Sequence, residues 1–95
     1  MIDLTGLAET PQALERIRGR IIGKAGRSRE QIEDMTGTYI SVYGKTVAII
    51  GFAEQIKTAR TAIDMLLNGV PHETVFSFLD KKKREAKQDM LGSYY

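Results

Sequence analysis

Two glycines three residues apart, in the segment Gly23-Lys24-Ala25-Gly26, constrain this chain more than any other feature. Apolar residues at helical spacing precede the segment, at Leu14, Ile17 and Ile21, and a second helical pattern follows it. Glycine adopts backbone angles that other residues avoid, so the pair can end one helix, turn the chain tightly and leave the amides of the loop uncovered. The sequence therefore predicts two helices joined by a short loop.

Capping signals predict the ends of these two helices. Thr10 fits the N-cap of the first helix, with Pro11 at the first helical position, where the missing N–H costs nothing. Ser28, followed three residues later by Gln31, fits a capping box at the start of the second helix. Gly37 fits the left-handed residue that closes the second helix.

The remaining segments predict the strands of a sheet and two more helices. Strand-like alternation or β-branched and aromatic residues mark 1–5, 38–43 and 46–50. Only Gly44-Lys45 separates the last two, which predicts a hairpin. Helical spacing recurs over 52–68 and 73–90. We therefore expect an α+β domain of order β-α-α-β-β-α, with helices on one face of a three-stranded, mostly antiparallel sheet, and an added C-terminal helix.

A chain of 95 residues has room for one small domain. We assign residues 1–70 to the domain, 71–91 to a helical extension and 92–95 to a disordered tail. The N-terminus lacks the pattern of a signal peptide and the apolar runs are short, so we expect a cytoplasmic protein with no membrane partner.

The composition argues against catalysis and against a bound metal or cofactor. The chain has no cysteine and one histidine, His72, which stands beside Pro71 at a helix boundary and fits a cap or surface role better than chemistry. Gly19 to Ala25 superficially resembles a phosphate-binding P-loop, but it has three residues between its glycines and no Ser or Thr after the lysine. Since no paired acids or nucleophile motifs appear either, we expect no catalytic residue, no metal, no cofactor and no RNA-processing enzyme.

The positive charge is concentrated around the glycine loop. Although the net charge is only +2, the 14 residues from Arg16 to Arg29 hold six of the 14 cations and no acid. On a helix Arg16 and Arg20 share a side while Arg18 points elsewhere. We expect Arg20 near a ligand, and Arg16 and Arg18 to contribute to the positive field or to outer contacts. A second cluster of cations, at 81–84, has acids on both sides of it in the sequence. Two interpretations are possible: a phosphate-binding face, or the solvated face of a helix.

The loop has the chemistry of a phosphate clamp. Two glycines allow a sugar–phosphate chain to approach the backbone, and the free N–H groups and positive end of the following helix attract phosphate oxygens. Lys24 adds a point charge and Arg27 a forked donor. We therefore expect a polyanion to bind at this loop.

The run from Gly19 to Arg27, followed by Ile32, by Thr36-Gly37 and by residues 39–42, resembles the KH domain. The KH signature is a helix ending in Ile-Ile, a Gly-x-x-Gly loop, a second helix, Thr-Gly and a strand. The resemblance implies the type I topology, single-stranded RNA as partner, the second strand at the sheet edge with free N–H and C=O groups, and an apolar groove floor. The implied RNA-binding residues are Arg20, Ile21, Ile22, Gly23, Lys24, Ala25, Gly26, Arg27, Arg29, Ile32, Ile40, Ser41 and Val42.

Strand alternation places Ile40 and Val42 toward the helices, and Tyr39, Ser41 and Tyr43 on the open face. For the two tyrosines, strand propensity is the favoured explanation, and stacking on bases is the alternative.

The segment 43–51 and the later residues Val70-Pro71-His72 narrow the resemblance to the second KH domain of archaeal partner-of-Nob proteins. That family implies binding near the 3′ end of small-subunit ribosomal RNA during ribosome assembly. It also implies a rRNA-processing endonuclease and the alpha subunit of translation initiation factor two as partners. Members carry two KH domains in tandem, and we expect this chain to supply only the second.

The alternative is a protein-interaction module. The stripe formed by Phe76, Leu79, Ala86 and Met90 would dock a nuclease or an initiation-factor subunit, although the same stripe also suits packing on its own domain.

Overall fold

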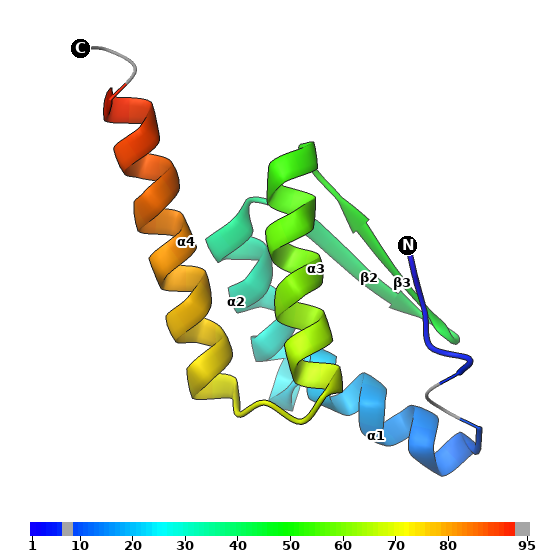
Figure 1. Ribbon diagram of the computed structural model, residues 1–95. Helices are drawn as coiled ribbons and strands as arrows, with labels where there is room; N and C mark the ends of the chain where they lie inside the picture. The colour runs from blue at the N-terminus through cyan, green and yellow to red at the C-terminus, as the bar shows by residue number, and fades with distance from the viewer. Residues whose placement is uncertain (7–8, 93–95) are drawn as a thin grey trace.

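The computed structural model describes residues 1–6 and 9–92, with side chains described as far as residue 85. Helices cover one face of an antiparallel sheet and leave the other face open (Figure 1). The elements in chain order are β1 (Ile2–Asp3), α1 (Pro11–Ile22), a 3-10 turn η1 (Lys24–Gly26), α2 (Arg27–Thr36), β2 (Tyr39–Tyr43), β3 (Thr46–Ile50), α3 (Ala53–Leu67) and α4 (His72–Gly92). The predicted α+β class and element order are confirmed.

The sheet has the strand order β1-β3-β2, so β2 forms one edge. Tyr43 pairs with Thr46 across a turn of only two residues, as predicted, and Gly44 reaches the positive φ of 55° that such a turn needs. β1 is shorter than expected, with Ile2 opposite Val47. The edge position of β2 leaves one side of its backbone without a partner strand.

The core lies between the sheet and the helices. The largest fully buried side chains come from all parts of the fold: Leu4, Ile21, Ile32, Ile63, Leu66, Leu79, Val47 and Val75. Ile40 is buried and Val42 half-buried, whereas Tyr39 and Tyr43 are 74% and 81% exposed. The predicted alternation of β2 is therefore confirmed.

α4 packs against α2 and α3 on the side away from the sheet (Figure 1). Leu79 is buried, Phe76 is half-buried against the core, and Val75, which the predicted stripe missed, has no exposed surface. The first half of α4 thus completes the core of this domain. The predicted stripe residues Ala86 and Met90, and the tail residues 93–95, lie outside the described side chains.

Two capping predictions are confirmed and one is wrong. Gly37 closes α2 in the left-handed conformation, as predicted, with a φ of 69°. The Thr10 hydroxyl accepts a hydrogen bond from the Ala13 N–H at 3.1 Å, and α1 begins at Pro11 as expected. Ser28 does not cap α2, because Gly26 takes that position in the left-handed conformation and the helix begins at Arg27. A glycine with a φ of 75° turns the chain into the helix directly, and Ser28 is left buried in the first turn.

Candidate nucleic-acid interface

A shallow groove lies where the end of α1, the start of α2 and the edge strand β2 come together. Its volume is about 270 Å³, and its lining residues are Ile22, Arg29, Ile40, Ser41 and Val42. All five belong to the predicted site. The groove begins directly beside the glycine loop, because Ile22 precedes Gly23 in the chain.

The loop backbone requires glycine at its first position. Gly23 has φ 74° and ψ 178°, a region that only glycine adopts readily. A Cβ atom at Gly23 would lie 2.8 Å from the backbone nitrogen of Ser28 and 2.7 Å from its Cβ. The first turn of α2 therefore packs directly on Gly23, and this contact holds the loop in place.

The middle of the loop projects outward. Lys24 and Ala25 are exposed, and Ala25 has a positive φ of 56°, a conformation that costs a non-glycine residue about 1–2 kcal/mol. Arg27 follows at the first position of α2 and is also exposed. Within the described part of the chain, neither Lys24 nor Arg27 forms a salt bridge, so both charges can meet a ligand at the positive end of α2.

Two predicted floor residues lie behind the groove instead. Ile21 and Ile32 have no exposed surface, so they cannot contact a base. Ile21 and Ile22 are adjacent on α1, and their directions differ by about 100°, which sends one into the core and the other to the groove. The expectation that both isoleucines of the pair form the floor is wrong.

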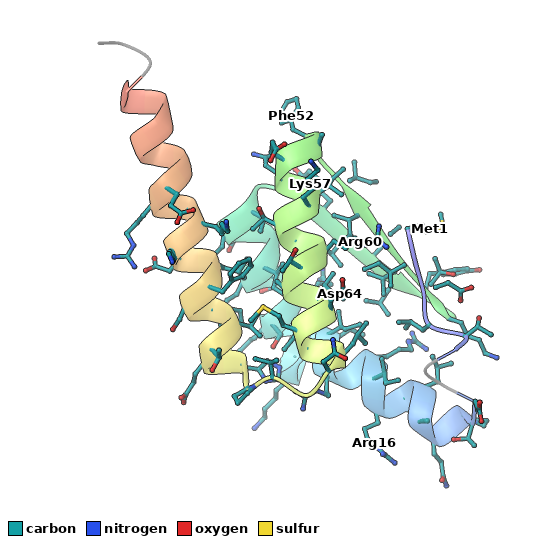
Figure 2. All side chains as sticks on the ribbon, viewed as in Figure 1. Met1, Arg16, Phe52, Lys57, Arg60 and Asp64 are labelled. Atoms are coloured by element: carbon teal, nitrogen blue, oxygen red, sulfur yellow. The ribbon has the colours of Figure 1, made fainter. Side chains whose placement is uncertain are left out.

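Arg20 also has a different role from the expected one. Its guanidinium donates to the carbonyl oxygens of Leu66, at 2.9 Å, and Val70, at 3.1 Å. The carbonyl oxygen of Arg20 lies 3.1 Å from Nε2 of His72. Arg20 and His72 thus tie the end of α1 to the connection between α3 and α4, and Arg16 points away from the body of the domain (Figure 2).

Glu33 bonds to two of the groove residues, and the sequence reasoning missed it. Its Oε2 accepts a hydrogen bond from the Ile40 N–H at 2.7 Å, and its Oε1 accepts one from Nη1 of Arg29 at 2.9 Å. Nη1 of Arg29 also lies 3.5 Å from the Ile40 carbonyl oxygen. The spacing of Arg29 and Glu33, four residues apart on one helix, was the available signal.

These contacts change the expectation of a free strand edge. In a hairpin with a two-residue turn, the residues flanking the turn form a hydrogen-bonded pair, so the backbone groups of Ile40 and Val42 face outward. At Ile40 the side chains of α2 already occupy these groups. Of the two outward-facing positions of β2, Val42 is the one whose backbone N–H and C=O are left for a ligand.

A family model for the second KH domain of PNO1, described as the eukaryotic type KH-domain (KH-domain type I), matches residues 1–84. This chain belongs to the type I KH-domain family. The predicted family and topology are confirmed.

Relatives of this KH domain occur in archaea and eukaryotes. It is 41% identical over 88 residues to a KH domain-containing protein of Methanocaldococcus jannaschii, covering 93% of this chain and 39% of the relative. It is 41% identical over 69 residues to the pre-rRNA-processing protein PNO1 of Chaetomium thermophilum, covering 73% of this chain and 27% of the relative.

Solved structures share the fold. In a complex of a/eIF2alpha, aDim2p and rRNA from Pyrococcus horikoshii, one chain is 51% identical to this KH domain with a TM-score of 0.81, over 88% of this chain and 45% of that one. A protein of unknown function from Aeropyrum pernix is 43% identical with a TM-score of 0.90, over 98% of this chain and 50% of that one. This chain therefore spans half or less of the length of these relatives.

No helix within residues 1–6 and 9–92 has the length and apolar character needed to cross a membrane. Among the side chains of residues 1–6 and 9–85, no group of three acids, histidines or cysteines could hold a metal ion.

Proposed function

We propose that this KH domain binds a short stretch of single-stranded RNA, with the sugar–phosphate backbone at the glycine loop and the bases in the adjoining groove. The observation that carries the proposal is the loop itself. A glycine-dependent backbone, the exposed cations Lys24 and Arg27 and the start of α2 lie together in the chain, and Ile22 of the adjoining groove directly precedes Gly23. KH loops of this kind clamp about four backbone nucleotides.

The proposed RNA is ribosomal, near the 3′ end of the small-subunit rRNA. Two relatives support this choice, because one is a pre-rRNA-processing protein and the other is part of a complex that contains rRNA. The proposed role is non-enzymatic: the domain holds the RNA while the small subunit matures.

The test is a charge reversal at the loop, in which Lys24 and Ala25 are both changed to Asp. Both side chains are exposed, so the fold should persist while the loop repels phosphate. Binding to a 3′-terminal small-subunit rRNA oligonucleotide, followed by fluorescence anisotropy, should weaken by at least roughly ten-fold, the effect of losing about 1.4 kcal/mol.

A matched control carries the same charge change on another surface. Ala53 and Lys57 are exposed on the first turns of α3, where Figure 2 labels Lys57. Changing both to Asp should leave binding unchanged. Equal affinities of the loop variant and the wild type, with both folded by circular dichroism, would refute the loop-centred function.

The salt dependence provides an independent measurement. Each phosphate neutralised on a single strand contributes a slope of about −0.7 to a plot of log affinity against log salt concentration. With Lys24 and Arg27 as the phosphate contacts, the expected slope is about −1.4. A complex insensitive to salt would contradict phosphate binding.

The partner hypothesis also has one supporting observation. The Pyrococcus horikoshii relative occurs in a complex with the alpha subunit of an initiation factor. We propose the corresponding subunit as a second partner of this chain, to be tested by analytical ultracentrifugation of the two purified proteins. Independent sedimentation at micromolar concentrations would exclude it.

A further inference from the structure

Arg29 is held in the groove by one of its two terminal nitrogens. The hydrogen bonds to Glu33 and to the Ile40 carbonyl both leave from Nη1. Among the described residues, Nε and Nη2 have no hydrogen-bond partner, and the side chain is 33% exposed. One edge of a planar forked donor is thus fixed in direction and open to a ligand.

The position of Arg29 lies between the two parts of the proposed RNA site. On one side its Nη1 reaches the edge strand at Ile40. On the other side its Nη2 lies 3.8 Å from the place where a Cβ atom on Gly26 would stand. A nucleotide whose phosphate rests on the loop would bring its base against the open edge of this guanidinium.

Glu33 decides whether that contact is to phosphate or to base. A carboxylate with an exposed fraction of only 16% repels a nearby phosphate. Because Glu33 pairs with Arg29 at 2.9 Å, the pair has no net charge and attracts phosphate weakly. What remains is the geometry of the fork, whose two parallel N–H groups match two adjacent acceptors.

We propose that Arg29, positioned by Glu33, selects the base that enters the groove. The selected base presents two adjacent hydrogen-bond acceptors, which are O2 and N3 in cytosine or N7 and O6 in guanine. Uracil and adenine lack such an adjacent pair and are disfavoured. This inference rests on the proposed RNA-binding function and adds the selectivity of the same site.

The test uses uracil decamers that carry one central cytosine, guanine, 7-deazaguanine or adenine. The wild type should bind the cytosine or the guanine decamer roughly ten-fold more tightly than the all-uracil and adenine decamers. If guanine is the preferred base, replacing N7 with carbon in 7-deazaguanine abolishes the preference. If cytosine is preferred, the two guanine probes bind alike.

Three variants at Arg29 and Lys24 separate base selection from phosphate binding. In Arg29→Met the preference should disappear while the salt slope is unchanged. In Lys24→Met the preference should persist while the slope falls in magnitude by about 0.7, the contribution of one phosphate. Arg29→Lys keeps the charge without the fork and should also lose the preference.

Glu33→Gln tests the positioning role. Glutamine keeps an acceptor for the Ile40 N–H but no longer neutralises Arg29. The preference should therefore fall, and the salt slope should steepen by up to about 0.7 as the freed guanidinium attracts phosphate. A merely structural glutamate would change the thermal stability and leave the slope unaltered.

Some results would overturn the inference and spare the proposed function. The first is a wild type without base preference that still depends on Lys24. The second is an Arg29→Met variant that keeps the preference and loses salt dependence, which would make Arg29 a phosphate contact. RNA binding that survives the double Asp change in the loop would refute the proposed function instead.

Discussion

Replacing Gly23 by alanine should destabilise the domain far more than the same replacement at Gly26, although both glycines belong to one motif. The new methyl group at position 23 would lie 2.8 Å from the backbone nitrogen and 2.7 Å from the Cβ of Ser28. Backbone atoms in the first turn of a helix cannot rotate away as a flexible side chain can. At Gly26 the nearest atom is Nη2 of Arg29 at 3.8 Å, an ordinary contact.

The magnitudes follow from the backbone angles and the contacts. At Gly23 the strained φ and ψ cost about 1–3 kcal/mol, and forcing α2 to shift adds about 1–3 kcal/mol. At Gly26 the left-handed conformation alone costs about 1–2 kcal/mol. Alanine reduces the entropy of the unfolded chain equally at both sites, so this term cancels in the comparison. The expected difference in unfolding free energy is about 2 kcal/mol or more.

Thermal and urea denaturation, both followed by circular dichroism, measure this difference. For a domain of this size, 2 kcal/mol corresponds to a gap of about 8–16 °C in Tm between the two variants. The urea m-value should stay the same, which would show that the native state alone is affected. Equal stabilities of the two variants would refute the claim that packing on Ser28, beyond backbone conformation, fixes the identity of residue 23.

Three further predictions concern the end of α1 and the N-terminal strand. Ile21→Ala should lower the unfolding free energy by about 2–5 kcal/mol, because Ile21 is fully buried. Ile22→Ala should lower it less but weaken RNA binding, because Ile22 lines the groove. Denaturation measures the first effect and fluorescence anisotropy the second. Arg20→Ala should lower Tm through the loss of two charged hydrogen bonds, and the folded variant should bind RNA like the wild type. Hydrogen bonds from the Thr5 hydroxyl and N–H hold the pKa of Asp3 below its ordinary value. At pH values above the pKa that Asp3 has in the unfolded chain, its carboxylate therefore stabilises the fold. This stability is lost as the pH falls through the lower pKa of the folded state. NMR titration of Thr5→Ala should give a higher pKa for Asp3.

Local signals predicted the elements of this fold well. Helical spacing, the Thr10 cap and the short turn at Gly44 all depend on residues within a few positions of one another, and the structure confirms each of them. The Ser28 cap was wrong for a local reason as well, since a left-handed glycine and a side-chain cap are alternative ways to begin a helix.

The details of the site depended on contacts that the sequence does not reveal. The partners of Arg20 lie 46 and 50 residues away, and those contacts turn a cation of the basic segment into a structural tie. Glu33 reaches Ile40 across the gap between a helix and a strand, and no spacing rule links the two. Pattern analysis therefore located the groove but assigned the wrong roles to some of its neighbours.

Few of the cations in the basic segment 16–29 are available to a ligand, and this limits the electrostatic part of RNA binding. The basic segment has six cations. Arg20 is bonded to the connection between α3 and α4, Nε of Arg18 is buried, Arg16 points away from the domain and Arg29 is neutralised by Glu33. Lys24 and Arg27 remain at the loop, and two phosphate contacts give only a modest affinity that does not depend on sequence. Because electrostatic attraction is this limited, tight binding must come from contacts to the bases. The acid beside the groove therefore favours selectivity: Glu33 neutralises Arg29, which lowers the attraction for RNA of any sequence, and fixes a donor that fits particular bases.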